Sequence, residues 1–81
     1  MRQVLTHAAQ MGRVIASRRR ALKLSQRALA AKLAISQNRL SEIETDASTL
    51  TLERLVEISN LLGLDLIIQD RQPQRSAKDD W

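Results

Sequence analysis

Residues 25–44, which read SQRALAAKLAISQNRLSEIE, decide the fold because they describe two short helices joined by a tight turn. Ser25 and Ser36 each precede a stretch with apolar residues at helical spacing, and both are predicted N-caps. The closest crossing of the two helices requires a small residue, and Ala30 supplies it. The inward-facing positions are all aliphatic, namely Leu29, Leu33, Ile35, Leu40 and Ile43. The sequence therefore predicts a tightly packed helix pair.

Helices are also predicted on either side of this pair. The first runs from a cap at Thr6 to about Lys23, and the last from a cap at Thr51 to Gly63, a typical residue after a helix end. Apolar residues recur at helical spacing in both. The inner stripe of the first helix is formed by Ala8, Met11, Ile15 and Leu22. That of the last helix is formed by Leu52, Leu55, Ile58, Leu61 and Leu62.

The segment after Gly63 changes its periodicity. Residues 64–69 alternate and carry β-branched side chains, which predicts a short strand. A lone strand needs a partner for its backbone groups, and we expect the same segment of a second copy to supply it. The strand residues that would form this dimer contact are Leu64, Leu66, Ile67 and Ile68.

The predicted fold class is therefore all-α, with four to five helices and a short C-terminal β-strand that pairs across a dimer. The expected organisation is a helical domain over residues 1–63, a dimerisation strand over 64–70 and a tail over 71–81. The tail is polar, contains the only proline and has nothing to bury, so we expect it to be disordered.

Charge is strongly separated along the chain. Residues 1–40 hold nine basic residues and no acid, whereas residues 41–81 hold four basic and nine acidic residues, so the halves carry +9 and −5. A basic half of one sign indicates a polyanionic partner, and nucleic acid is the first candidate. A membrane-surface helix would need large apolar anchors that this chain lacks, and its apolar runs are too short to span a bilayer. We expect a cytoplasmic protein without a signal peptide.

Several function classes are not expected from the composition. The chain has no cysteine and a single histidine, His7, so neither a metal site nor a disulfide is expected. With only two glycines it has no glycine-rich phosphate loop, and its serines have no paired catalytic group. We expect no cofactor and no enzymatic activity. Phenylalanine and tyrosine are absent and Trp81 is terminal, so the core must be aliphatic.

The exposed side chains of the second helix in the pair suit the edges of DNA bases. Glutamine and asparagine can bond adenine in bidentate fashion, arginine can bond guanine or phosphate, and glutamate can accept from cytosine. The N-terminal half of this helix is the part that reaches the major groove in such a pair. The exposed positions are Ser36, Gln37, Asn38, Arg39, Ser41 and Glu42.

Met11 to Ile15, Leu24 to Ala30 and Ile35 to Glu44 together resemble the Xre/phage-repressor helix-turn-helix family, with similarity over about residues 10–66. The resemblance implies a compact all-α domain that binds operator DNA as a dimer. It implies an ion pair between Arg19 and Glu44. The base-reading residues that it implies are Ser36, Gln37, Asn38, Ser41 and Glu42. The expected DNA-backbone contacts are Gln26, Arg27 and Arg39, with Arg18 and Arg20 as either phosphate contacts or solvated side chains.

Two positions depart from the family pattern. Ala34 stands where the turn normally has glycine, and at positive φ an alanine would cost about 1 kcal/mol. Asp46 and Leu50 replace the usual glycine and proline, so the shape of the loop before the last helix is open.

The last helix ends in Leu61-Leu62-Gly63-Leu64-Asp65-Leu66 and is followed by a short strand and a polar tail. This ending resembles the HipB-type antitoxins, which pair a short strand across a dimer. These small repressors are encoded beside a HipA-type serine/threonine kinase toxin, which they hold. The resemblance implies operator DNA, a second copy and a kinase toxin as partners, in the cytoplasm at the nucleoid. Trp81 is either an incidental exposed residue or an anchor on a protein partner. The alternatives are a stand-alone Xre-type regulator, an antitoxin of another toxin class, and a protein-interaction module that reads no DNA.

Overall fold

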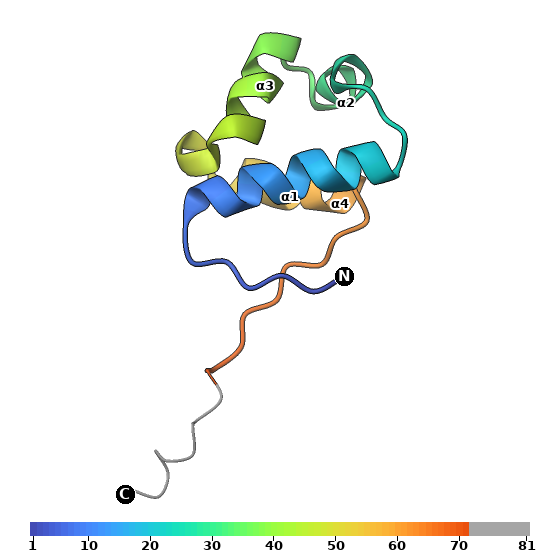
Figure 1. Cartoon of the computed structure of the whole chain (residues 1–81). Helices are drawn as coiled ribbons and strands as arrows, with labels where there is room; N and C mark the ends of the chain where they lie inside the picture. Colours follow the sequence, from blue (N-terminus) through green and yellow to red (C-terminus); the bar gives the residue numbers. More distant parts are fainter. Residues whose placement is uncertain (72–81) are drawn as a thin grey trace, which may run out of the picture.

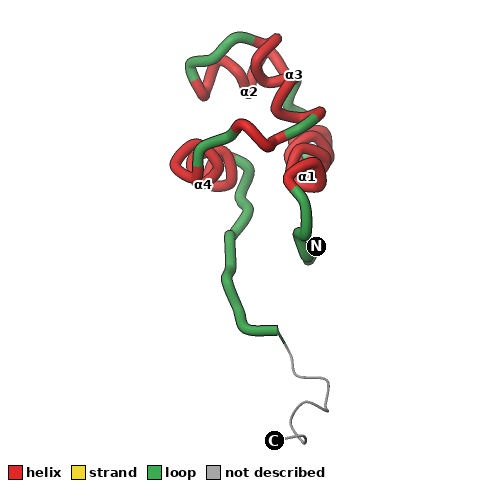
Figure 2. Tube along the Cα trace, turned by 90° about the vertical axis from the view of Figure 1, so that its left-hand side faces the viewer, coloured by secondary structure: helices red, strands yellow, loops and turns green. Residues whose placement is uncertain are grey.

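The computed structural model describes residues 1–71 and is built from helices alone over that range (Figure 1). The helices pack in two layers: α2 and α3 lie over α1 and α4, which run side by side (Figures 1 and 2). The predicted all-α fold is confirmed. The elements are α1 (Ala8–Ala21), α2 (Gln26–Leu33), α3 (Gln37–Thr45), the 3₁₀ turn η1 (Ala47–Thr49) and α4 (Leu52–Leu61).

Three of the four predicted helix starts are confirmed by their caps. The Ser25 hydroxyl accepts from the N–H of the third residue along at 2.9 Å, and Ser36 does the same at 3.0 Å. Thr51 caps α4 through an equivalent bond of 3.1 Å. Each cap satisfies a backbone donor that has no partner inside the helix. These bonds are local, which is why sequence alone could place them.

The start of α1 was predicted one residue too early. His7, not Thr6, is the N-cap. The side-chain oxygen of Gln10 accepts from the backbone N–H of His7 at 2.8 Å, and the Thr6 hydroxyl donates to the same oxygen at 3.0 Å. The Gln10 side chain, inside α1, thus satisfies the backbone N–H of the N-cap residue, as in a capping box.

The core is aliphatic, as expected. Its centre lies where α1, α2, α3 and α4 converge. Four residues that helical periodicity had placed inside are instead exposed, namely Ala8, Leu22, Leu52 and Leu61. Ala8 and Leu52 begin their helices and Leu22 follows the last residue of α1, where neighbouring elements no longer cover the inner stripe. The buried hydrophobic cluster consists of Met11, Ile15, Leu29, Ala30, Leu33, Leu40, Ile43, Ala47, Ile58 and Leu62.

The loop before α4 is closed by its own side chains. Asp46 accepts from the N–H of Ser48 at 3.0 Å and so begins η1. Ala47 is buried, and Leu50 packs partly buried against the core. The loop thus forms without the glycine and proline that the family pattern has here.

In the turn between α2 and α3, Ala34 has a left-handed conformation, the positive φ that the family pattern suggested for this position. This residue has φ 58° and ψ 40°, and its N–H bonds the carbonyl of Ala31 at 3.2 Å. An L-residue with a Cβ is strained in this region, whereas glycine is not.

Ala34→Gly is therefore expected to raise the free energy of unfolding by about 0.5–1 kcal/mol, the strain relieved less the extra entropy of glycine in the unfolded chain. Ala34 is exposed, so little packing is lost. Urea titration measures the change. The control is Ala31→Gly, an exposed site inside α2, which should lose about 1 kcal/mol. Equal losses in both variants would refute the strain at Ala34.

Residues 64–71 leave the helices as a loop and run away from α2 and α3 (Figures 1 and 2). Leu64 is half-buried against the core, whereas Leu66, Ile67 and Ile68 are 42%, 75% and 100% exposed. Within residues 1–71 no strand forms, so the strand prediction, which needs a second copy, stays a prediction. The expected disorder of the tail and the role of Trp81 concern residues beyond those described.

Candidate nucleic-acid interface

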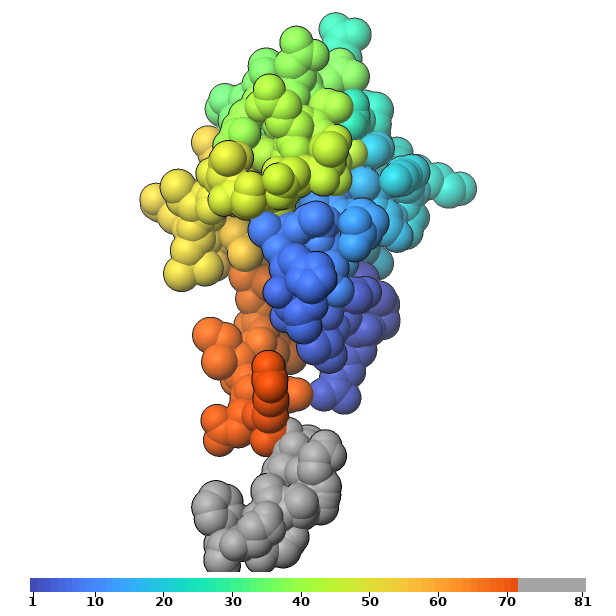
Figure 3. Space-filling model, turned by 60° about the vertical axis from the view of Figure 1, so that its left-hand side comes forward, coloured from blue at the N-terminus to red at the C-terminus, as the bar shows by residue number. Residues whose placement is uncertain are grey.

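The surface of α3 forms the end of the molecule opposite residues 64–71 (Figure 3). Leu40 and Ile43 anchor this helix in the core, at 0% and 1% exposure. The side chains on its other faces are free to meet a partner. The residues predicted to read bases are all exposed, namely Ser36, Gln37, Asn38, Ser41 and Glu42.

Gln26, the first residue of α2, links Gln37 at the start of α3 to Glu44 near its end. Its amide nitrogen donates to Glu44 Oε1 at 3.0 Å, and its amide oxygen accepts from Gln37 Nε2 at 3.5 Å. Gln26 is half-buried and Gln37 is exposed. These contacts place the Gln37 amide beside Gln26 at the N-terminal turn of α3.

Glu44 in turn is held by Arg19. The guanidinium contacts both carboxylate oxygens, from Nε to Oε2 at 2.7 Å and from NH2 to Oε1 at 3.1 Å. Its NH1 also donates to the carbonyl of Leu24 at 2.9 Å. Both side chains are nearly buried, at 11% and 8% exposure. The two-pronged geometry fixes α1 to the end of α3, so Arg19 and Glu44 are structural residues here.

The remaining basic residues assigned to the DNA backbone divide into two groups. Arg20 and Arg27 are exposed, as a phosphate contact requires. Arg39 is half-buried. Its NH1 donates to the hydroxyl of Thr49 in η1 at 3.1 Å and to Oε1 of Glu42 in α3 at 3.4 Å. Both partners of Arg39 are on the surface, so the side chain remains accessible to a phosphate.

Arg18 makes a contact within the chain that the sequence did not predict. Its Nε donates to the carbonyl oxygen of Leu62 at 2.8 Å, in a partly buried bond between α1 and the end of α4. The carbonyls at a helix C-terminus lack partners and attract cations. We therefore assign Arg18 a structural role. Its partner, Leu62, is distant in sequence, so the spacing of residues along α1 did not reveal this contact.

Sequence reasoning missed two further residues that position α3. Arg54 of α4 donates from NH1 to the carbonyl of Leu33 at 2.9 Å, which caps the end of α2 beside the turn. Gly12 lies where α1 touches α3, and a Cβ there would be 2.6 Å from the carbonyl oxygens of Ile43 and Glu44. Both roles depend on contacts between distant segments, for which the sequence carries no local signal.

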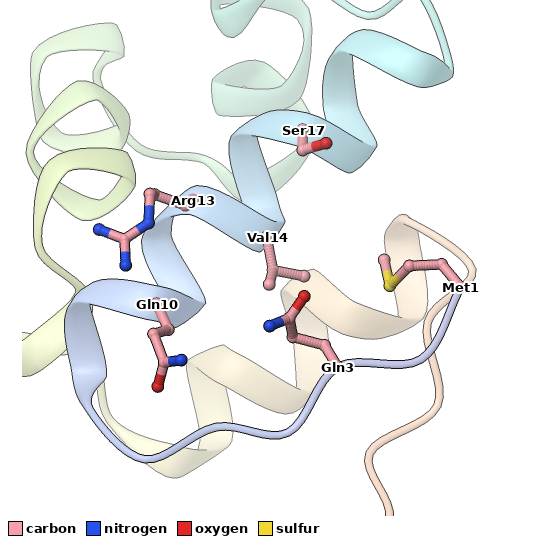
Figure 4. A pocket seen from close by; sticks show the side chains of 6 residues that line it. All are labelled: Met1, Gln3, Gln10, Arg13, Val14 and Ser17. Atoms are coloured by element: carbon pink, nitrogen blue, oxygen red, sulfur yellow. The ribbon is translucent and has the colours of Figure 1, made fainter.

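Two hollows lie away from α3. One, of about 240 Å³, lies between the N-terminal segment and α1, where Arg13 is the only charged side chain among its lining residues (Figure 4). The other, of about 450 Å³, lies between α4 and the segment after it. Its lining mixes apolar and polar side chains and consists of Val56, Ser59, Asn60, Leu64, Asp65, Leu66 and Ile67.

Over residues 1–71 there is no group of three His, Cys, Asp or Glu side chains that could hold a metal ion. In the same range, no helix has the length and apolar character needed to cross a membrane.

Two helices joined by a left-handed turn, with an exposed polar face on the second and basic residues nearby, define a helix-turn-helix DNA-binding protein. The model of the Helix-turn-helix family HTH_3 matches residues 15–68. The chain belongs to this Xre-type helix-turn-helix family. This confirms the family resemblance found in the sequence.

Among solved structures, the crystal structure of Fe(II)-HppE with the alternative substrate (S)-1-HPP is similar, with a TM-score of 0.68 and 22% identity. The match covers 89% of this chain and 44% of that one, so the chain spans less than half the length of that protein. At this identity the similarity shows the fold alone, and the iron and substrate belong to HppE. No curated protein matches the chain.

Proposed function

We propose that this protein is a sequence-specific repressor that reads an operator with α3. The observation that carries the proposal is the arrangement at the start of α3. There, exposed Gln37 is bonded to Gln26, and Gln26 is bonded to the buried pair of Arg19 and Glu44. A side chain oriented before binding loses less entropy when it bonds a base. We propose Ser36, Gln37, Asn38, Ser41 and Glu42 as base contacts, and Gln26, Arg20, Arg27 and Arg39 as backbone contacts.

Gln37→Ala is expected to weaken binding to the specific site by about 1–3 kcal/mol and binding to random DNA by little, because only the former uses the bidentate base contact. Titration of both duplexes at one fixed salt concentration measures the two affinities. Gln3→Ala, which removes an exposed amide from the N-terminal segment, is the matched control and should change neither. Equal losses on both duplexes would refute Gln37 as a base-reading residue.

We also propose that the protein acts as a homodimer through α4 and residues 64–69. Leu52 and Val56 lie one turn apart on α4 and are 74% and 41% exposed, and Val56 lines a hollow together with Leu66 and Ile67. A second copy beside α4, related by an axis along the molecule, would place both α3 helices at one end and both C-terminal segments at the other. Such a dimer suits a near-palindromic operator with half-sites about one helical turn apart. Pairing of the two segments would form the predicted strand.

The finer proposal is that the protein is the antitoxin of a type II toxin-antitoxin system. It would repress its own operon and neutralise a HipA-type serine/threonine kinase, in the cytoplasm at the nucleoid, without enzymatic activity of its own. Support comes from the resemblance of residues 61–69 to HipB-type antitoxins. We propose that Trp81 docks on the toxin, because tryptophans are frequent anchors in protein interfaces.

A pull-down of the tagged full chain from native cells, scored for both protein and DNA, tests the antitoxin role. Recovery of a kinase together with the protein's own promoter is the expected result, and deletion of Trp81 should reduce the kinase recovered. Promoter DNA without a protein partner would contradict the antitoxin role and favour a stand-alone Xre-type regulator. A toxin other than a kinase would point to another toxin class.

A further inference from the structure

Two consecutive arginines on α1 hold two different helices. Arg19 holds the end of α3 through Glu44 at 2.7 Å, and Arg18 holds the end of α4 through the Leu62 carbonyl at 2.8 Å. Successive residues on a helix point about 100° apart, so neighbours can serve different elements. The helix that supports the reading face therefore also carries the contact at which the C-terminal segment begins.

The Arg18 contact lies where the chain changes direction. Leu62 is the C-cap of α4, and the next residue, Gly63, has φ +70°. The N–H of Leu64 then returns to the Ser59 carbonyl at 2.8 Å, which closes the helix end. A Cβ on Gly63 would lie 3.4 Å from Arg18 NH2, so the guanidinium packs directly against the turn. A charge-assisted bond to this carbonyl resists rotation of the turn relative to α1.

We propose that Arg18 is a positioning residue that sets the direction in which residues 64–68 leave the domain, and thereby the half-site spacing that the dimer accepts. The inference rests on the proposed dimeric function. If two copies meet through α4 and this segment, the angle at Gly63 determines how the second domain is placed. Arg18 and Arg19 then connect the dimer contact to α3 through one rigid helix.

The experiment uses the full chain and duplexes that carry the half-site selected by the wild-type protein from random DNA. One duplex carries a single copy, and a series carries two inverted copies at centre-to-centre spacings around about 10 base pairs. The variants are Arg18→Met, which removes the donor, and Arg18→Lys, which keeps a cation. Arg13→Met is the matched control, because it removes an exposed arginine from the same helix. Gly63→Ala, which alters the same turn with Arg18 intact, serves as an independent second variant.

Arg18→Met should bind the single-copy duplex like Arg13→Met. It should bind the best two-copy duplex about tenfold more weakly, the loss expected for one charge-assisted hydrogen bond, and should discriminate less between spacings. Arg18→Lys should restore part of the discrimination, and Gly63→Ala should also reduce it. An unchanged spacing profile in Arg18→Met would overturn the inference, as would equal losses on single-copy and two-copy duplexes. If the wild-type protein itself prefers no spacing, the dimeric function fails and the inference fails with it.

Discussion

Replacing Gly12 with alanine is expected to lower the free energy of unfolding by about 3 kcal/mol, which is at the upper end for overpacking. The added Cβ would lie 2.6 Å from the main-chain oxygens of both Ile43 and Glu44. These atoms belong to the backbone of α3 and cannot move aside like a flexible side chain. The gain in helix propensity, about 1 kcal/mol, offsets only part of the clash. Thermal or urea unfolding followed by circular dichroism measures the loss.

The control is Ser17→Ala, which places alanine at an exposed site of the same helix. Its stability should stay within about 0.5 kcal/mol of wild type. If Gly12→Ala were as stable as Ser17→Ala, α1 and α3 would not approach as closely as described here.

Glu44→Leu is expected to lower the free energy of unfolding by about 3–4 kcal/mol, because it leaves the Arg19 guanidinium buried without a counter-ion. The two side chains are 11% and 8% exposed, so water replaces little of the lost interaction. The same change removes the acceptor that holds Gln26, and Gln26 contacts Gln37. DNA affinity should therefore also fall under conditions where the variant is still folded.

A double variant separates the cost of burying an unpaired charge from the stabilisation that the ion pair itself contributes. Arg19→Met combined with Glu44→Leu should recover at least half of the loss, since two apolar groups leave no uncompensated charge. Glu57→Gln breaks the more exposed pair with Arg54, 2.8 Å apart, and should cost less than about 1 kcal/mol. A double variant no more stable than Glu44→Leu would contradict this account of the pair.

The features that could be predicted from the sequence are those with local causes. Ser25, Ser36 and Thr51 cap their own helices through bonds to residues three positions on, and such bonds depend little on the rest of the fold. The exposed polar face of α3 follows from the spacing of the two buried residues that anchor it, Leu40 and Ile43. Sequence and structure therefore agree on the reading face.

The features that could not be predicted depend on distant segments. Arg18, Arg19 and Arg20 are indistinguishable as a charge run, and only the position of α4 assigns Arg18 to the Leu62 carbonyl. Leu52 matches the helical period of α4, but its side chain lies outside the core and is 74% exposed. The strand predicted after Gly63 needs a second copy, which a single chain cannot supply.

Selection of bound duplexes from random DNA by the wild-type protein tests whether α3 reads a base sequence. We expect enrichment of one inverted repeat whose half-sites lie about one helical turn apart, with protection from cleavage over both halves. Binding to DNA without enrichment of any sequence would contradict it, because α3 would then contact phosphates and not base edges.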